Sequence, residues 1–299
     1  MSHTLVSNTV QRVRRQLASG YRLETNVLNG ALDAVSTTVS VAYAMPVGLQ
    51  PGAIIYVDTE AMRVVTVNAA AQTFTVIRGY YDSDAATHAD ASEVVINPRF
   101  SPLDIIDALR EEIASYGPQL YRVDADEFTV VEVQDTLALP LAWNDCYGVI
   151  DVRRQWADNG GVDSWPRIQS RFQRGDSNWT ATSGASIIRF IQTVQAGTIY
   201  VQVARPFVIS SLTLATDLVT DVKLPESMLD VVAMGTKLRL LVDNENGRTA
   251  RTAQDEPRRA EETPVGSTMQ PLQLNTSLYR NRKQEEINKL RAQWPVRYS

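Results

Sequence analysis

The sequence predicts an α+β protein. Its helical core is discontinuous along the chain and carries two inserted antiparallel β units, a small barrel-like module and a β-sandwich-like domain. Three observations lead to this fold class. Apolar residues recur at helical spacing at both ends of the chain and once nearer its middle. Between these segments lie two stretches of short β-branched runs separated by turn residues. Each helical segment has one apolar face, so we expect these segments to pack together into one core.

The chain opens with a helix and lead-in at residues 1–31, followed by the barrel-like module at residues 32–98. The apolar residues that share one face of the first helix are Val6, Val10, Val13 and Leu17. The β-branched runs of the module start at Thr38, Ala53, Arg63, Thr73 and Glu93. Five short strands in so short a stretch favour a small barrel or sandwich.

A further helix of the core is predicted at residues 99–118, and the second antiparallel β domain at residues 119–224. Ser101 supplies a capping hydroxyl for the helix, and Asp104 completes a pattern close to a capping box. The clearest strands of the β domain begin at Phe128, Gly148, Ile187 and Thr198.

Residues 225–299 are predicted to form the C-terminal helices and a docking tail. A helix that starts near Leu224 is expected to end at Asp243–Gly247, because Gly247 is suited to the left-handed position after a helix. Residues 248–269 are expected to form an irregular link. The apolar face of the final helix, which Pro295 ends, consists of Tyr279, Ile287, Leu290 and Trp294.

Charge is concentrated at the two ends of the chain. The formal net charge is -5, but residues 1–22 and residues 270–299 each carry +4, which leaves -13 on the rest. Because phosphate binding needs a basic face, this distribution argues against nucleic acid as the main ligand. Basic ends suit docking on an acidic partner or on an acidic neighbouring copy. The alternative is that these arginines lie on solvated helix faces.

Composition excludes several classes of protein. A single cysteine, Cys146, cannot form an internal disulfide, and no apolar stretch reaches the roughly 20 residues of a membrane helix. We also expect no signal peptide. With only two histidines, His3 and His88, the chain cannot supply a zinc cluster, and it contains no serine nucleophile elbow and no glycine-rich phosphate loop. We therefore expect no enzyme, no catalytic residue, no metal and no cofactor.

Three alternatives remain open. Asp124–Glu127 and Asp243–Gly247 have the alternating oxygen ligands of a calcium loop but lack its closing glutamate. A hydrolase would need a pair of carboxylates that the spacing does not reveal. If this is a tail or baseplate protein that binds host surface carbohydrate, tryptophans of the second β region would stack on sugar rings. Otherwise these tryptophans would cover the sandwich core. They are Trp143, Trp156, Trp165 and Trp179.

Several motifs resemble those of tailed-phage proteins. An acidic strand at residues 58–64, a strand ending in Arg78–Gly79 and a loop containing His88 are together similar to a small β module of tailed-phage virion proteins. Residues 97–101, 224–241 and 279–295, in this order, resemble head–tail connector adaptors, the head-completion or neck proteins beneath the portal.

This resemblance implies a structural virion protein that forms a ring-shaped adaptor between the phage portal and the tail and continues the DNA channel. It implies a homo-oligomeric ring of about 12 copies. Its partners would be the portal protein and a tail-side stopper or tail terminator protein. Double-stranded DNA would pass through the lumen without sequence-specific binding. The protein would be assembled in the host cytoplasm and reside in the virion neck.

The resemblance also implies that the C-terminal segment inserts into the portal. The residues assigned to this docking tail are Arg291, Trp294, Pro295, Arg297 and Tyr298. An aromatic residue and an arginine at a chain end are typical anchors of protein interfaces. Contacts between subunits are assigned to Arg12, Arg14 and Arg15.

Overall fold

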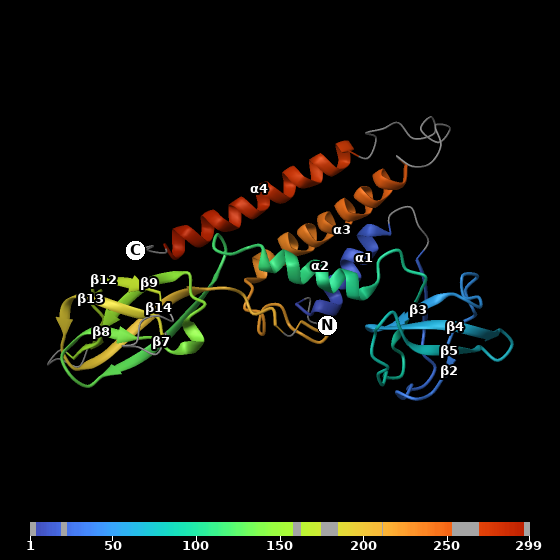
Figure 1. Cartoon of the computed structure of the whole chain (residues 1–299), viewed down its shortest axis with the longest axis horizontal. Coiled ribbons are helices and arrows are strands. Elements are labelled where there is room, and N and C mark those ends of the chain that lie inside the picture. The colour runs from blue at the N-terminus through green and yellow to red at the C-terminus, as the bar shows by residue number, and fades with distance from the viewer. Residues whose placement is uncertain are drawn as a thin grey trace. The chain divides into compact units, whose positions relative to one another are not determined.

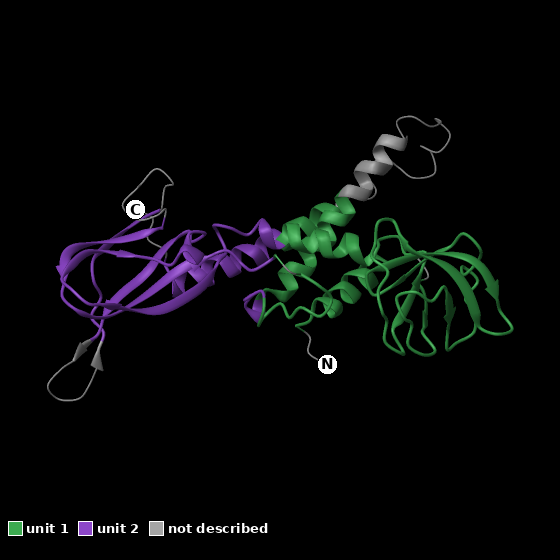
Figure 2. Ribbon diagram, turned by 60° about the horizontal axis from the view of Figure 1, so that its bottom comes forward, with its two compact units in different colours: residues 1–112, 210–221, 228–279 green, residues 113–209, 222–227, 280–299 purple. Residues whose placement is uncertain are grey.

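The structure, a computed structural model, describes residues 4–18, 23–157, 163–174, 185–210, 212–252 and 269–295. It divides into two compact units, each assembled from separate stretches of the chain (Figure 2). Unit 1 consists of residues 1–112, 210–221 and 228–279, and unit 2 of residues 113–209, 222–227 and 280–299. No helix among the described residues is long and apolar enough to cross a membrane. The α+β class with barrel-like and sandwich-like units is confirmed.

Unit 1 contains a six-stranded antiparallel sheet that curls into a small barrel (Figure 1). Its strands are β1 (Glu24–Val27), β2 (Thr38–Ser40), β3 (Ile54–Val57), β4 (Glu60–Asn68), β5 (Thr73–Tyr80) and β6 (Glu93–Ile96). Their order is β1-β6-β3-β4-β5-β2. A bridge between Leu28 and Val41 joins the two outer strands just beyond their ends, so the sheet closes on itself. Phe74, Ile55 and Met62 are fully buried inside it.

All five predicted strands of this module are present, but the sequence analysis missed β1 within the lead-in. The residues of β1 are Glu-Thr-Asn-Val, which carry no apolar alternation. Asn26 is nevertheless buried because its side chain accepts a hydrogen bond from the backbone of Tyr43 and donates one to the carbonyl of the same residue. These residues therefore form a strand because they pair with distant segments of the chain, and their local sequence pattern does not predict it.

The first two helices of unit 1 confirm the predicted apolar face of one and the predicted cap of the other. Helix α1 (Val6–Leu17) buries the four residues of its predicted stripe and packs against α3 (Leu229–Thr252). Helix α2 (Pro102–Ala114) begins with the predicted capping box: Ser101 Oγ accepts a hydrogen bond from the Asp104 N–H, and the Asp104 carboxylate accepts one from the Ser101 N–H. A short 3-10 turn, η2 (Glu226–Met228), leads into α3.

The expected end of the helix at Asp243–Gly247 is wrong, because α3 continues to Thr252. Asparagine, aspartate and glycine each disfavour a helix interior by at most about 1 kcal/mol, which is too little to end a long helix. Of the expected irregular link at 248–269, residues 253–268 lie outside the described part of the chain. Helix α4 (Met269–Gln293) then follows.

Unit 2 is a sandwich of two three-stranded antiparallel sheets (Figure 1). The first sheet has the order β7-β14-β9, with β7 (Arg122–Val130), β14 (Gly197–Arg205) and β9 (Gly148–Arg154). The second has the order β12-β13-β8, with β12 (Ser170–Gln173), β13 (Ile187–Val194) and β8 (Gln134–Ala138). A 3-10 turn, η1 (Leu141–Trp143), and a two-stranded ribbon of β10 (Trp156–Ala157) and β11 (Asp163–Ser164) complete it. One apolar core is shared by both sheets, as in other sandwiches.

Candidate functional site

The barrel module holds a buried cluster of ionisable side chains at one end of β4. Glu60 is 1% exposed, and its carboxylate accepts two hydrogen bonds from Arg78, at 2.6 Å from Nε and 2.7 Å from Nη2. His88 lies between two carboxylates, with Nδ1 2.8 Å from Asp58 and Nε2 2.8 Å from Glu60. Arg78 also donates to the backbone carbonyls of Asp33, Ser36 and Ala86. These contacts fasten the loop that contains His88 to the barrel wall.

The electrostatics of this cluster favour the charged forms. Burial raises the pKa of Glu60, but hydrogen bonds from Arg78, from the Ala86 N–H and from His88 outweigh it and lower the pKa to about 2. Burial lowers the pKa of His88, but the hydrogen bonds to Asp58 and Glu60 outweigh it and raise the pKa overall. Because the Glu60 carboxylate already has all these partners, it is a structural anchor and has no capacity left to act as a base.

A second buried cluster joins the helices of unit 1. Glu112 on α2 is 3% exposed and accepts hydrogen bonds from Arg239 Nε on α3, at 2.7 Å, and from the Tyr279 hydroxyl on α4. Gly235 lies directly against this carboxylate, since a Cβ at that position would come within 2.3 Å of it. The close approach explains a glycine in the middle of a helix, where it otherwise costs stability.

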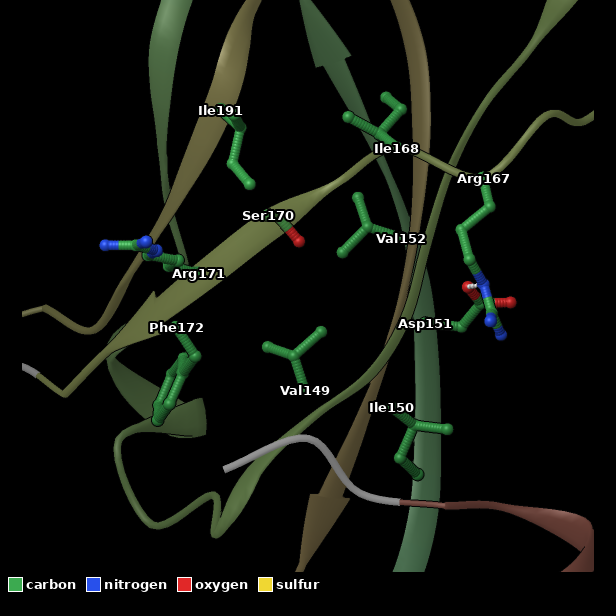
Figure 3. Close-up of a pocket in the computed structure, with 10 residues that line it drawn as sticks. All are labelled: Val149, Ile150, Asp151, Val152, Arg167, Ile168, Ser170, Arg171, Phe172 and Ile191. Carbon is green, nitrogen blue, oxygen red and sulfur yellow. Dashed lines mark hydrogen bonds and ion pairs between the residues drawn. The ribbon is translucent and has the colours of Figure 1, made fainter. Parts of the chain in front are cut away.

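Unit 2 contains a cavity of about 250 Å³ between the edge strands β9 and β12 (Figure 3). It is lined by Val149, Ile150, Asp151, Val152, Arg167, Ile168, Ser170, Arg171, Phe172 and Ile191. Burial raises the pKa of Asp151, but hydrogen bonds from Arg167 at 2.5 Å and Arg153 at 2.7 Å outweigh it and lower the pKa. Each oxygen of this carboxylate thus accepts from an arginine, and the described residues that line the cavity include no second carboxylate.

The three arginines assigned to subunit contacts have different environments. Arg12 and Arg15 are exposed on α1. Arg14 is only 7% exposed and forms an ion pair with Glu93 at 2.6 Å, so it links the helix to β6. Arg14 and Arg99 line a cavity of about 380 Å³ at the C-terminal end of α1. Their role between subunits stays a prediction.

The residues assigned to the docking tail are split between described and undescribed parts of the chain. Arg291 and Pro295 are exposed. Trp294 is half-buried within unit 2, where it packs with Leu290 on a cluster formed by Tyr121, Ile150 and Ala204. The Tyr121 hydroxyl donates to the Trp294 carbonyl. Arg297 and Tyr298 lie outside the described residues.

The structure bears on the calcium-loop and carbohydrate-binding alternatives. Asp124 and Asp126 lie on one face of β7 and Glu127 on the other, and the Asp124 carboxylate pairs with Arg122 and Arg205, so the three carboxylates do not form one cation site. The side chains of Asp243–Gly247 lie outside the described part, and the described residues contain no group of three potential metal ligands. Trp143 is buried in the sandwich core against Phe128, and Trp165 packs on Tyr200. The side chain of Trp156 and the whole of Trp179 are not described.

No protein-family model matches the chain, and no curated protein matches it. Among solved structures, it is similar to a chain from the neck of an empty GTA particle computed with C6 symmetry. The two chains are 15% identical, the TM-score is 0.22, and the match covers 46% of this chain and 64% of the neck chain. A likeness of this size carries no argument about function.

Glu60, Arg78 and His88 belong to one sequence motif, but nothing in that motif predicts that their side chains meet. Arg78 and His88 follow Glu60 by 18 and 28 residues, so only the register of β4 with β5 and the course of the following loop bring them together. Glu112 was not singled out at all, although a charged residue in the apolar stripe of a helix is a signal of a buried partner.

Proposed function

We propose that this protein is a structural component of a tailed-phage virion, a ring-shaped adaptor between the portal and the tail that continues the DNA channel. It has no catalytic role and works by presenting large surfaces to neighbouring copies and to the proteins above and below it. The portal protein is the partner on the head side. A stopper or tail terminator protein is the partner on the tail side.

The observation that supports this proposal is that the motif residues bond to one another inside the fold. Inside the barrel, Glu60 pairs with both Arg78 and His88. Among the helices, Glu112 contacts Gly235 and Arg239. Residues with such saturated hydrogen bonding stabilise a scaffold and have no free group for chemistry. The resemblance to tailed-phage virion proteins therefore rests on residues that build the fold, as expected of a structural protein.

The helical segment that resembles the adaptors is closely packed in the fold. Between Leu224 and Leu240, the buried residues are Leu224, Met228, Val231, Val232, Ala233, Gly235, Thr236, Leu238 and Leu240. A rigid helical frame suits a ring subunit, because heterologous contacts close a ring only when each copy holds one shape.

The charge distribution supports a channel that DNA passes through without being gripped. Apart from its basic ends, the chain carries -13, and acidic walls repel phosphates. The basic ends provide complementary charge for docking on acidic surfaces of the portal.

The test is to mix the purified protein with the portal of its phage and to examine the mixture by mass photometry and negative-stain electron microscopy. We expect rings seated on the portal. A protein that neither binds the portal nor forms rings would refute the proposal.

The docking tail is tested by substitution, because a deletion that removes Trp294 would also remove part of the unit 2 packing. We expect Arg297→Ala with Tyr298→Ala to weaken portal binding by at least about tenfold. The matched control is Arg280→Ala, which changes an exposed arginine of α4. Equal binding by both variants would contradict the assignment of the tail.

A further inference from the structure

The cavity at the C-terminal end of α1 has the character of a docking pocket. Its volume is about 380 Å³. Its lining is mostly apolar but includes two arginines, and consists of Arg14, Leu17, Ala18, Leu23, Ile96, Asn97, Pro98, Arg99 and Phe100. A pocket of this composition suits an apolar group that carries an acid beside it.

Arg14 supplies a second, independent indication of a ligand. Its side chain is more than nine-tenths buried, and Nη2 pairs with Glu93 at 2.6 Å. Its Nε, however, has no hydrogen-bond partner among the described residues. A buried donor without an acceptor costs free energy, and an acceptor brought by a partner would remove that cost.

The chain itself exposes a segment of complementary chemistry. In unit 2 the connection from β7 to β8 consists of Val131, Glu132 and Val133, and its two valines are 80% and 64% exposed. Glu132 is exposed and forms no ion pair or hydrogen bond with any residue that the structure describes. The segment thus presents two exposed apolar side chains on either side of an exposed carboxylate, the chemistry that the cavity complements.

Other exposed apolar residues beside acids are less suitable. The ring of Tyr81 already packs on Tyr80, with 4.5 Å between the ring centroids. Val35 lies next to a turn in which the Asp33 carboxylate accepts hydrogen bonds from the backbone N–H groups of Val35 and Ser36.

We propose that Val131–Val133 of one copy docks into the Arg14 cavity of the next copy, with the valines against Leu17, Leu23 and Phe100 and the Glu132 carboxylate beside Arg14 and Arg99. The two surfaces lie on different units of the chain, so the contact is heterologous and repeats head to tail. The inference rests on the proposed function, since it names the contact that joins subunits of the ring.

The direct test is a disulfide between copies, formed in rings assembled on the portal. The single native cysteine, Cys146, is buried, and burial raises its pKa to about 11, so it does not compete. We expect the chain carrying Ala18→Cys and Val133→Cys to give a ladder of cross-linked multimers under oxidising conditions. An equal mixture of the two single variants should stop at dimers. The control pairs Ala18→Cys with Val47→Cys, a valine that is also exposed but lies on the barrel, and should give no ladder.

A charge reversal provides the second measurement. We expect Glu132→Lys to raise the concentration needed for ring assembly by at least about tenfold. The matched reversal Glu127→Lys, at an exposed acid of β7, should leave it nearly unchanged.

Rings that form normally with Glu132→Lys and show no Ala18–Val133 cross-link would overturn this contact while leaving the adaptor function intact. Absence of rings and of portal binding in the unaltered protein would overturn the adaptor function, and this inference with it.

Discussion

Replacing Glu60 with glutamine should loosen the barrel by a predictable amount. The substitution keeps the size of the side chain but leaves the buried Arg78 guanidinium without its countercharge. The pKa of Glu60 is about 2 in the fold, against an ordinary value of 4.5. This difference corresponds to about 3 kcal/mol of stability at neutral pH. The loss should appear as opening of the barrel strands.

The pH dependence gives this prediction its sign. Because the folded pKa of Glu60 is depressed, its stabilisation is fully present above pH 4.5 and is lost as the pH falls towards about 2. We would measure amide hydrogen exchange of β4 and β5 by mass spectrometry at pH 6 and pH 3, correcting for the intrinsic exchange rates. The unaltered protein should lose protection between these pH values, and Glu60→Gln should lose less.

The control for this experiment is Glu127→Gln, which neutralises an exposed carboxylate of β7. It should leave exchange in β4 and β5 unchanged. If Glu60→Gln exchanges like the unaltered protein at both pH values, then the Glu60–Arg78 pair does not hold the barrel and the reasoning is refuted.

Three further predictions test other parts of the fold. Gly235→Ala should destabilise the protein by about 2–4 kcal/mol in urea unfolding, because the new methyl group displaces the Glu112 carboxylate from its partners; an unchanged midpoint would contradict this. The pKa of His88 is raised in the folded protein, so its stabilisation is present below about pH 6.5 and is lost as the pH rises through the folded pKa. Exchange protection of the barrel should therefore decline as the pH rises, and His88→Gln should abolish this decline. Tyr121→Phe removes the hydrogen bond to the Trp294 carbonyl and should cost about 1 kcal/mol, seen as about fivefold faster carboxypeptidase digestion past Trp294, whereas equal rates would count against it.

The sequence predicts those parts of this fold that depend on local pattern. The apolar stripe of α1, the capping box of α2 and five strands of the barrel follow from spacing and side-chain type alone. Strand β1 could not be predicted, because its polar residues gain their partners from segments that lie elsewhere in the chain.

The candidate sites were less predictable than the fold, for a physical reason. The meeting of Glu60 with Arg78 depends on strand register, and the meeting of Glu112 with Arg239 joins residues 127 positions apart. Neither distance in sequence corresponds to a helical or strand period. For helix α3 the local pattern was misleading. Its Asp, Asn and Gly residues suggest a helix end, but the helical preference of the rest of the segment outweighs them.

The pairing of β1 with β6 sets how the barrel is joined to the rest of the chain. Glu24, the first residue of the barrel, lies opposite Ile96, its last, so the polypeptide enters and leaves at one point. Neighbouring antiparallel strands are only about 5 Å apart. Loss of the whole module by recombination would therefore leave two ends that a single short turn can join. The barrel is therefore joined to the rest of the chain as a single insertion whose entry and exit are neighbours.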